Sequence, residues 1–233
     1  MIGFYDYTVI LTYLSLLSAS VGIVISLSGS GHPYLGSFFL LFCGLCDAFD
    51  GKVARTKENR TKTECNFGIQ IDSLSDLVAF GVLPACIGVS LIQSSPFLHM
   101  AFPANKHIWY CLAGKFFLHA ILVLYILAAM IRLAYFNVTE EERQQRETCS
   151  RTYYTGMPVT SAALIFPFVL LLQYLLPIDI TLIYIGFAVL TGIAFLCRIQ
   201  IRKPGLRGIF IIIAIGLAEC IALMLYLRMK YPR

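Results

Sequence analysis

Four of the six aspartates in this chain lie between positions 47 and 76, and their spacing suits metal chemistry. Asp47 and Asp50 are three residues apart and Asp72 and Asp76 are four apart, so each pair shares one face of a helix. A short polar stretch between the helices lets these faces converge. Carboxylate oxygens favour hard ions such as Mg²⁺, Mn²⁺ or Ca²⁺ over Zn²⁺. The four acids predict a site for two divalent ions, Mg²⁺ or Mn²⁺, about 3.5–4 Å apart.

Small residues and one cation flank these acids. Gly51 directly follows the first acidic pair, Ala54 lies nearby, and Gly68 precedes the second pair by one turn. A glycine inside a helix costs about 1 kcal/mol relative to alanine, and here the small residues leave room for a flat or bulky group beside the metals. Arg55 offers a cation to a phosphate. Together these residues predict chemistry on a nucleotide diphosphate.

The elements that position the acids are membrane helices. Of the 233 residues, 58% are hydrophobic and 13% are charged, against about 25% charged in soluble domains. The mean hydropathy is +0.78, so lipid must solvate most of the chain. Apolar stretches near the length of a span run over 8–28, 34–54, 69–93, 108–136, 155–176, 179–197 and 207–227. We predict an all-α polytopic membrane bundle of six to seven transmembrane helices, forming a single domain over residues 1–233.

Lysine and arginine gather in three loops that follow even-numbered spans, at 52–62, 132–151 and 198–207. Basic loops face the cytoplasm, which puts these loops and the aspartates on the cytoplasmic side. The basic C-terminal tail would then lie outside, against the rule. Because the basic residues alternate with spans and form no single patch, we expect no nucleic-acid partner. Cys43 and Cys46 form a CxxC without a neighbouring histidine, and we interpret them as packing residues.

The acids and their neighbours resemble the signature of the CDP-alcohol phosphotransferase family, D-x2-D-G-x2-A-R followed by G-x3-D-x3-D. Every fixed position is filled, although the spacer of twelve residues is longer than usual for the family; the positions are Asp47, Asp50, Gly51, Ala54, Arg55, Gly68, Asp72 and Asp76. Three further runs, at 80–85, 132–138 and 154–158, are similar to the phosphatidylserine synthase branch, with Tyr135 in place of an arginine. The resemblance covers about residues 8–170.

The resemblance implies a phosphatidyltransferase that makes phosphatidylserine and CMP from CDP-diacylglycerol and L-serine at the cytoplasmic face of a cell membrane, as a homodimer. It implies that Asp47, Asp50 and Asp72 bind metal and that Asp76 binds a second metal, acts as the general base, or does both. Gly51, Ala54, Arg55 and Gly68 would line the pocket for the CDP-lipid. The serine carboxylate needs a cation, for which Arg132 and Arg151 are candidates, with Asn137 and Thr155 as polar neighbours.

Three alternatives remain open from the sequence. The acceptor alcohol could instead be glycerol phosphate, inositol phosphate or choline, and an archaeal enzyme would use an isoprenoid ether lipid as donor. A divalent-cation transporter would use the aspartates as an ion path, but this does not explain the positions of Gly51, Ala54 and Arg55. A non-catalytic scaffold would keep the metal site only for folding.

Overall fold

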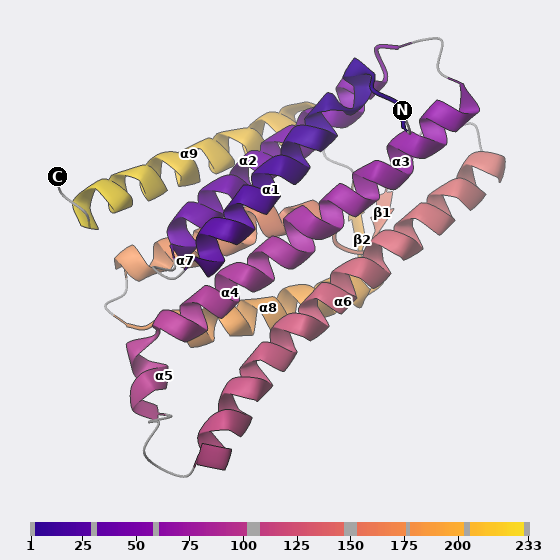
Figure 1. Cartoon of the computed structure of the whole chain (residues 1–233). Coiled ribbons are helices and arrows are strands. Elements are labelled where there is room, and N and C mark those ends of the chain that lie inside the picture. Colours follow the sequence, from indigo (N-terminus) through magenta and orange to yellow (C-terminus); the bar gives the residue numbers. More distant parts are fainter. Residues whose placement is uncertain are drawn as a thin grey trace.

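The computed structural model describes residues 3–28, 32–57, 61–101, 108–146, 153–175, 178–202 and 206–230. In these ranges the chain forms one elongated helical bundle (Figure 1). Its helices are α1 (Ile10–Leu27), α2 (Pro33–Ala54), α3 (Lys62–Asp76), α4 (Leu83–Ser94), α5 (Pro96–Ala101), α6 (Ile108–Arg146), α7 (Ala162–Leu175), α8 (Thr181–Leu196) and α9 (Leu206–Lys230). The 3₁₀ turns η1 (Tyr7–Val9) and η3 (Val159–Ser161) precede α1 and α7, and a π-helical turn, η2 (Leu77–Val82), joins α3 to α4.

The protein is an integral membrane protein with an all-α fold, as predicted. Four helical stretches are long and apolar enough to cross a bilayer: Tyr7–Leu27, Pro33–Ala54, Lys62–Ser94 and Leu112–Glu142. Three shorter apolar helices occupy Val159–Gln173, Thr181–Leu196 and Ile211–Leu225. These seven stretches correspond to the seven apolar segments of the sequence.

Three boundaries differ from the sequence prediction. The third segment begins at Lys62 instead of 69, because Thr61 and Glu64 form a capping box at its start. The fourth segment, α6, continues ten residues beyond 136 to Arg146, since its final turns are polar and carry no apolar signal. The fifth begins near 159 instead of 155, because Gly156 adopts a positive φ of 87° and Pro158 follows in an extended conformation.

The first two helices pack closely through small and polar side chains. The hydroxyl of Ser18 on α1 donates to the carbonyl oxygen of Phe39 on α2, at 3.1 Å, and the Cys43 thiol donates to the carbonyl oxygen of Ser15, at 3.2 Å. Small residues allow close backbone approach where lipid provides no hydrophobic drive between helices. Cys43 and Cys46 are both buried and free, in agreement with a packing role.

A short antiparallel ribbon, which the sequence did not predict, ties two loops together. Strand β1 (Tyr153–Thr155) follows α6, and its partner β2 (Gln200–Arg202) follows α8. Pairing places Tyr153 opposite Arg202, and the Gly156 N–H donates to the carbonyl oxygen of Ile199 beyond the ribbon, at 2.6 Å. Two of the three basic loops therefore lie at the same end of the bundle.

The far end of the α3–α4 helix is fastened by one carboxylate. Asp179, in the loop between α7 and α8, accepts hydrogen bonds from the Ser95 hydroxyl and from the backbone N–H of Phe97 at 3.2 Å. Its other oxygen accepts the Thr181 N–H at 2.9 Å, at the start of α8. Partial burial raises the pKa of Asp179, but these hydrogen bonds outweigh burial and lower it below its ordinary value.

Candidate metal and nucleotide site

The acidic residues come from the C-terminal parts of α2 and α3. Lys57 and the capping box set the path of the chain between these helices. The Lys57 ammonium donates to Asp6 at 2.6 Å and to Glu64 at 3.3 Å, which joins the segment before α1 to the start of α3. These bonds, the one to Asp6 first, raise the pKa of Lys57.

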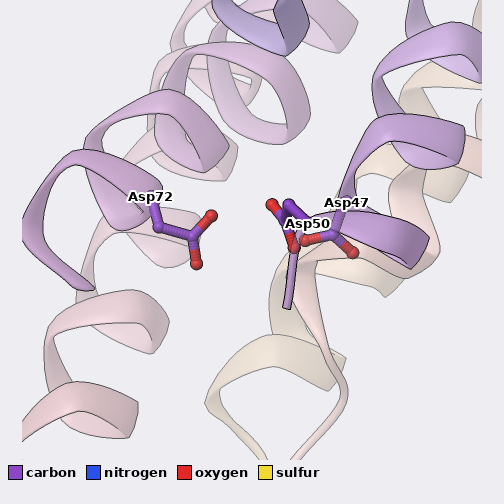
Figure 2. Close-up of side chains that lie close together, drawn as sticks. All are labelled: Asp47, Asp50 and Asp72. Atoms are coloured by element: carbon purple, nitrogen blue, oxygen red, sulfur yellow. The ribbon is translucent and has the colours of Figure 1, made fainter. Parts of the chain in front are cut away.

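Three of the predicted carboxylates converge. One oxygen from each of Asp47, Asp50 and Asp72 lies within 4.8 Å of the others. Figure 2 shows Asp72 on α3 facing Asp47 and Asp50 across the gap between the two helices. Asp50 is 9% exposed and accepts a hydrogen bond from the backbone N–H of Gly51, while Asp47 and Asp72 are half-buried.

Asp76 lies one helical turn beyond Asp72, on the same side of α3, and is 9% exposed. It does not belong to the set of three converging carboxylates. The preceding residue, Ser75, is buried and donates its hydroxyl to the carbonyl oxygen of Thr12 on α1, at 3.1 Å. This bond fixes the Asp76 turn against α1, and the predicted role of Asp76 as base or second ligand remains a prediction.

The charges of the cluster are not balanced by protein cations in the part of the chain that the structure describes. The ion pairs that Lys57 makes, with Asp6 and Glu64, do not involve the four acids of the signature. Burying carboxylates together without a counter-ion is costly, whereas a divalent cation held by several oxygens removes that cost. The donor set, three convergent carboxylates from two helices, therefore fits a hard divalent metal ion.

The small residues leave open space next to the acids. A Cβ added at Gly51 would meet only the Arg55 guanidinium, 3.7 Å away, within 4 Å. Both residues are exposed, and Ala54 and Gly68 are half-buried. Arg55 is the C-cap of α2, and its guanidinium lies over the last turn of that helix, beside Gly51.

The residues predicted to bind serine have different surroundings. Arg132 is 5% exposed and donates from Nε to the carbonyl oxygen of Met157, at 3.0 Å, and from Nη2 to that of Gly156, at 3.3 Å. Its guanidinium therefore organises the turn after β1. The Asn137 side-chain amide donates to the Ser73 hydroxyl at 2.7 Å, which places it beside the aspartate helix. Arg151 lies outside the described residues, and of Thr155 only the backbone, in β1, is described.

The sequence did not identify two residues, Ser73 and Tyr125, that connect α6 to the helix carrying Asp72 and Asp76. Ser73, next to Asp72, is joined to α6, and Tyr125 on α6 reaches the π turn that follows Asp76. Lone polar residues in apolar segments were the available signal, but their partners lie far away in the sequence.

The family model for CDP-alcohol phosphatidyltransferases matches residues 8–196. The chain belongs to the CDP-alcohol phosphatidyltransferase family. This confirms the prediction from the acidic signature, which lies inside the matched range.

Similar proteins from three groups of organisms carry related names. The CDP-diacylglycerol–serine O-phosphatidyltransferase of Saccharomyces cerevisiae is 32% identical over 143 residues, which are 60% of this chain and 43% of the yeast protein. The Helicobacter pylori J99 protein of the same name is 26% identical over 196 residues, 82% of this chain and 70% of that protein. The archaetidylserine synthase of Methanothermobacter thermautotrophicus is 32% identical over 151 residues, 64% of this chain and 52% of that protein. The chain thus spans less than half of the yeast protein and about half of the archaeal one.

Proposed function

We propose that this protein is a CDP-diacylglycerol–serine O-phosphatidyltransferase, which makes phosphatidylserine and CMP from CDP-diacylglycerol and L-serine. The convergence of Asp47, Asp50 and Asp72 from two membrane helices, within the signature of the family, carries this proposal. The serine acceptor is supported by the names of the yeast and Helicobacter pylori relatives. We propose one catalytic domain over residues 1–233.

The three converging carboxylates are the proposed ligands of Mg²⁺ or Mn²⁺, with Asp76 as a candidate ligand of a second ion. Divalent cations held by these residues would neutralise the diphosphate of the donor and stabilise the negative charge of CMP as it leaves. The absence of any ion pair to these acids among the described residues supports this assignment, because the carboxylates then need a cation from outside the chain.

Asp76 is the proposed general base. It takes the proton from the serine hydroxyl, and the serine oxygen forms a bond to the phosphorus that bears diacylglycerol. The bond between that phosphorus and the bridging oxygen of the diphosphate breaks, and CMP leaves with the electron pair. Its place one turn beyond Asp72 supports this role, because a base must lie beside the reacting phosphate.

The CDP group is proposed to lie over the end of α2 and the middle of α3, lined by Gly51, Ala54, Arg55 and Gly68. The open space at Gly51 supports this location, since a side chain there would occupy the room that a nucleotide needs. Arg55 is placed to pair with a phosphate of the donor. The acyl chains stay in the bilayer, so the pocket must open sideways to membrane lipid.

The serine pocket is proposed to lie between Asn137 and the turn that Arg132 organises, with Arg151 and Thr155 as further contacts. Asn137 supports this location because its bond to Ser73 holds it next to Asp72. Since Arg132 already donates to two backbone carbonyls, we expect its substitution to disturb the shape of the pocket as well as its charge.

The active site is proposed to face the cytoplasm, and the enzyme to act as a homodimer. The positive-inside rule supports the orientation, because the basic loops share one end of the bundle with the aspartates. The dimer follows from the resemblance to the family.

The test is CMP release by the purified protein in detergent with CDP-diacylglycerol. Serine, glycerol phosphate, inositol phosphate and water are compared as acceptors, with Mg²⁺, Mn²⁺ or a chelator. Asp72→Asn removes one converging carboxylate, and Asp179→Asn makes the same chemical change at the far end of the bundle. We expect serine-dependent release that requires metal, is abolished by Asp72→Asn and survives Asp179→Asn. Release with another acceptor alone would overturn the serine assignment, and no release would favour a transporter or scaffold.

A second candidate is an archaetidylserine synthase, because a relative of that name is as similar as the yeast protein. The two candidates share the acceptor and differ in the lipid donor. Serine-dependent CMP release from CDP-archaeol that exceeds release from CDP-diacylglycerol would favour this second candidate.

A further inference from the structure

The helix that carries Asp72 and Asp76 changes its hydrogen-bond pattern directly after Asp76. Over Leu77–Val82 it forms a π-helical turn, and the backbone N–H of Leu83 donates to the carbonyl oxygen of Val78, five residues earlier. Such turns are rare and are often found at functional sites. One inserted residue rotates everything that follows by about 100° relative to an uninterrupted α-helix. The π turn therefore changes the angle between the side of α3 that carries the acids and the side of α4 that packs into the bundle.

Pro84 removes one backbone donor from this turn. The α-helical donor for the Phe80 carbonyl would be the backbone N–H of residue 84, but Pro84 has none. Inside a membrane a carbonyl without a donor is costly. The hydroxyl of Tyr125, on α6, donates to the carbonyl oxygen of Phe80 at 2.6 Å and so supplies a donor from another helix.

Tyr125 is itself held rigidly. It is 2% exposed, and its ring packs edge-on against Phe166 of α7, with 5.4 Å between ring centroids. The ring of Phe195 on α8 lies tilted against it, with 5.8 Å between centroids. One turn further along α6, Ala129 is fully buried, and its Cβ would lie 3.4 Å from a Cβ added at Gly81. Contacts with α7 and α8 therefore hold the ring of Tyr125 in place while its hydroxyl bonds to the π turn.

A second bond joins the same two helices on the other side of Asp76. Asn137 of α6 donates to Ser73, three residues before Asp76, while Tyr125 bonds to Phe80, four residues after it. Helix α6 runs alongside the α3–α4 helix in Figure 1, so these two bonds brace the segment that carries Asp76 at both ends.

We propose that Tyr125 is a positioning residue, which holds Asp76 in its reactive place through the carbonyl of Phe80 and the π turn. The proposal rests on the role assigned to Asp76 in the proposed function. It predicts that the hydroxyl matters for the chemical step more than for substrate binding, because Tyr125 contacts the helix backbone that carries the acid.

The chain offers a matched control in Tyr184 of α8. Tyr184 is also completely buried, and its hydroxyl donates to a backbone carbonyl of the same helix, that of Pro84, at 2.7 Å. Its bond lies eight residues beyond Asp76, inside α4 and past the π turn. Tyr125→Phe and Tyr184→Phe therefore each remove one hydroxyl donor to the α3–α4 helix, at different distances from the acid.

The experiment compares both variants with the wild-type protein in the serine-dependent CMP-release assay, with thermal midpoints measured in the same detergent. We expect Tyr125→Phe to lower kcat about tenfold to a hundredfold, in line with the cost of misplacing a catalytic group by about 1 Å. The KM for CDP-diacylglycerol should stay unchanged. Tyr184→Phe should lower the midpoint similarly and leave kcat near the wild-type value. Equal kcat for the two variants, or a loss in KM alone, would overturn the proposal.

A second measurement does not depend on activity. A hydrophobic carbodiimide is reacted with each protein, and the labelling rate of Asp76 is followed by mass spectrometry. Asp76 should react several-fold faster in Tyr125→Phe than in Tyr184→Phe, because its turn has lost its brace. Equal labelling rates in the two variants would refute the positioning role of Tyr125, whether or not the wild-type protein is active. A wild-type protein that is inactive with every acceptor would instead refute the proposed function.

Discussion

The close contact between α2 and α7 at Gly44 predicts a strong effect of adding one methyl group there. A Cβ at Gly44 would lie 2.6 Å from the Cβ of Ala163, which is 3% exposed. Carbon atoms in contact are about 3.5–4.0 Å apart, so the two helices must separate by about 1 Å. Neither Cβ can move without its backbone, and no rotamer change relieves the clash.

The magnitude follows from two opposing terms. Overpacking of this kind costs about 1–3 kcal/mol, whereas replacing glycine by alanine in a helix contributes about 1 kcal/mol of stability. The net loss of stability for Gly44→Ala is therefore about 0–2 kcal/mol. The effect on activity should be larger, because Asp47 lies less than one turn from Gly44 and moves with α2. A displacement of about 1 Å at a catalytic group can cost a factor of about 100 in rate.

The assay is serine-dependent CMP release at saturating metal, together with the thermal midpoint in detergent. Gly186→Ala on α8 is the matched control, because a Cβ added there meets nothing within 4 Å. We expect the control to keep full activity with an equal or slightly higher midpoint. If Gly44→Ala behaves like Gly186→Ala in both measurements, the reasoning from the α2–α7 contact is wrong.

Three further predictions concern the metal, one loop carboxylate and one turn. Mn²⁺ at 100 times its Kd should stabilise the wild-type protein by about 2.7 kcal/mol, and Asp72→Asn should abolish most of the accompanying rise in thermal midpoint. Asp179→Ala should lose about 1 kcal/mol of stability at neutral pH with little change in activity. The folded-state pKa of Asp179 is lowered, so its contribution is present above the unfolded-state pKa and is lost as pH falls through the folded value. The stabilities of variant and wild type should therefore begin to converge as pH falls below about 4. Gly156→Ala should cost about 1–2 kcal/mol in thermal denaturation, because φ is 87° and the new Cβ would lie 3.2 Å from Nε of Arg132.

Each of these three predictions has a result that contradicts it. An Asp72→Asn protein that keeps the whole Mn²⁺-induced shift would exclude Asp72 as a ligand. A stability difference for Asp179→Ala that persists unchanged at acidic pH would show that its charge plays no part. An unchanged midpoint for Gly156→Ala would mean that the turn after β1 tolerates a side chain.

The sequence alone determined the membrane class, the approximate spans and the acidic signature. These features are local, because hydropathy is read over a window about as long as a span, and the spacing of Asp47 and Asp50 fixes their shared helix face without knowledge of any other element. The same periodicity paired Asp72 with Asp76 and correctly brought both helices to one site. The family followed from the same short stretch of chain.

Only the tertiary structure decided which groups hold the acids in place. It separated Asp76 from the three converging carboxylates, engaged Arg132 with the carbonyls of Gly156 and Met157, and joined Tyr125 to the π turn. Each of these outcomes depends on a contact between residues far apart in the chain. Hydropathy and spacing describe one helix at a time, whereas a hydrogen bond across a bundle depends on how two helices pack and rotate against each other.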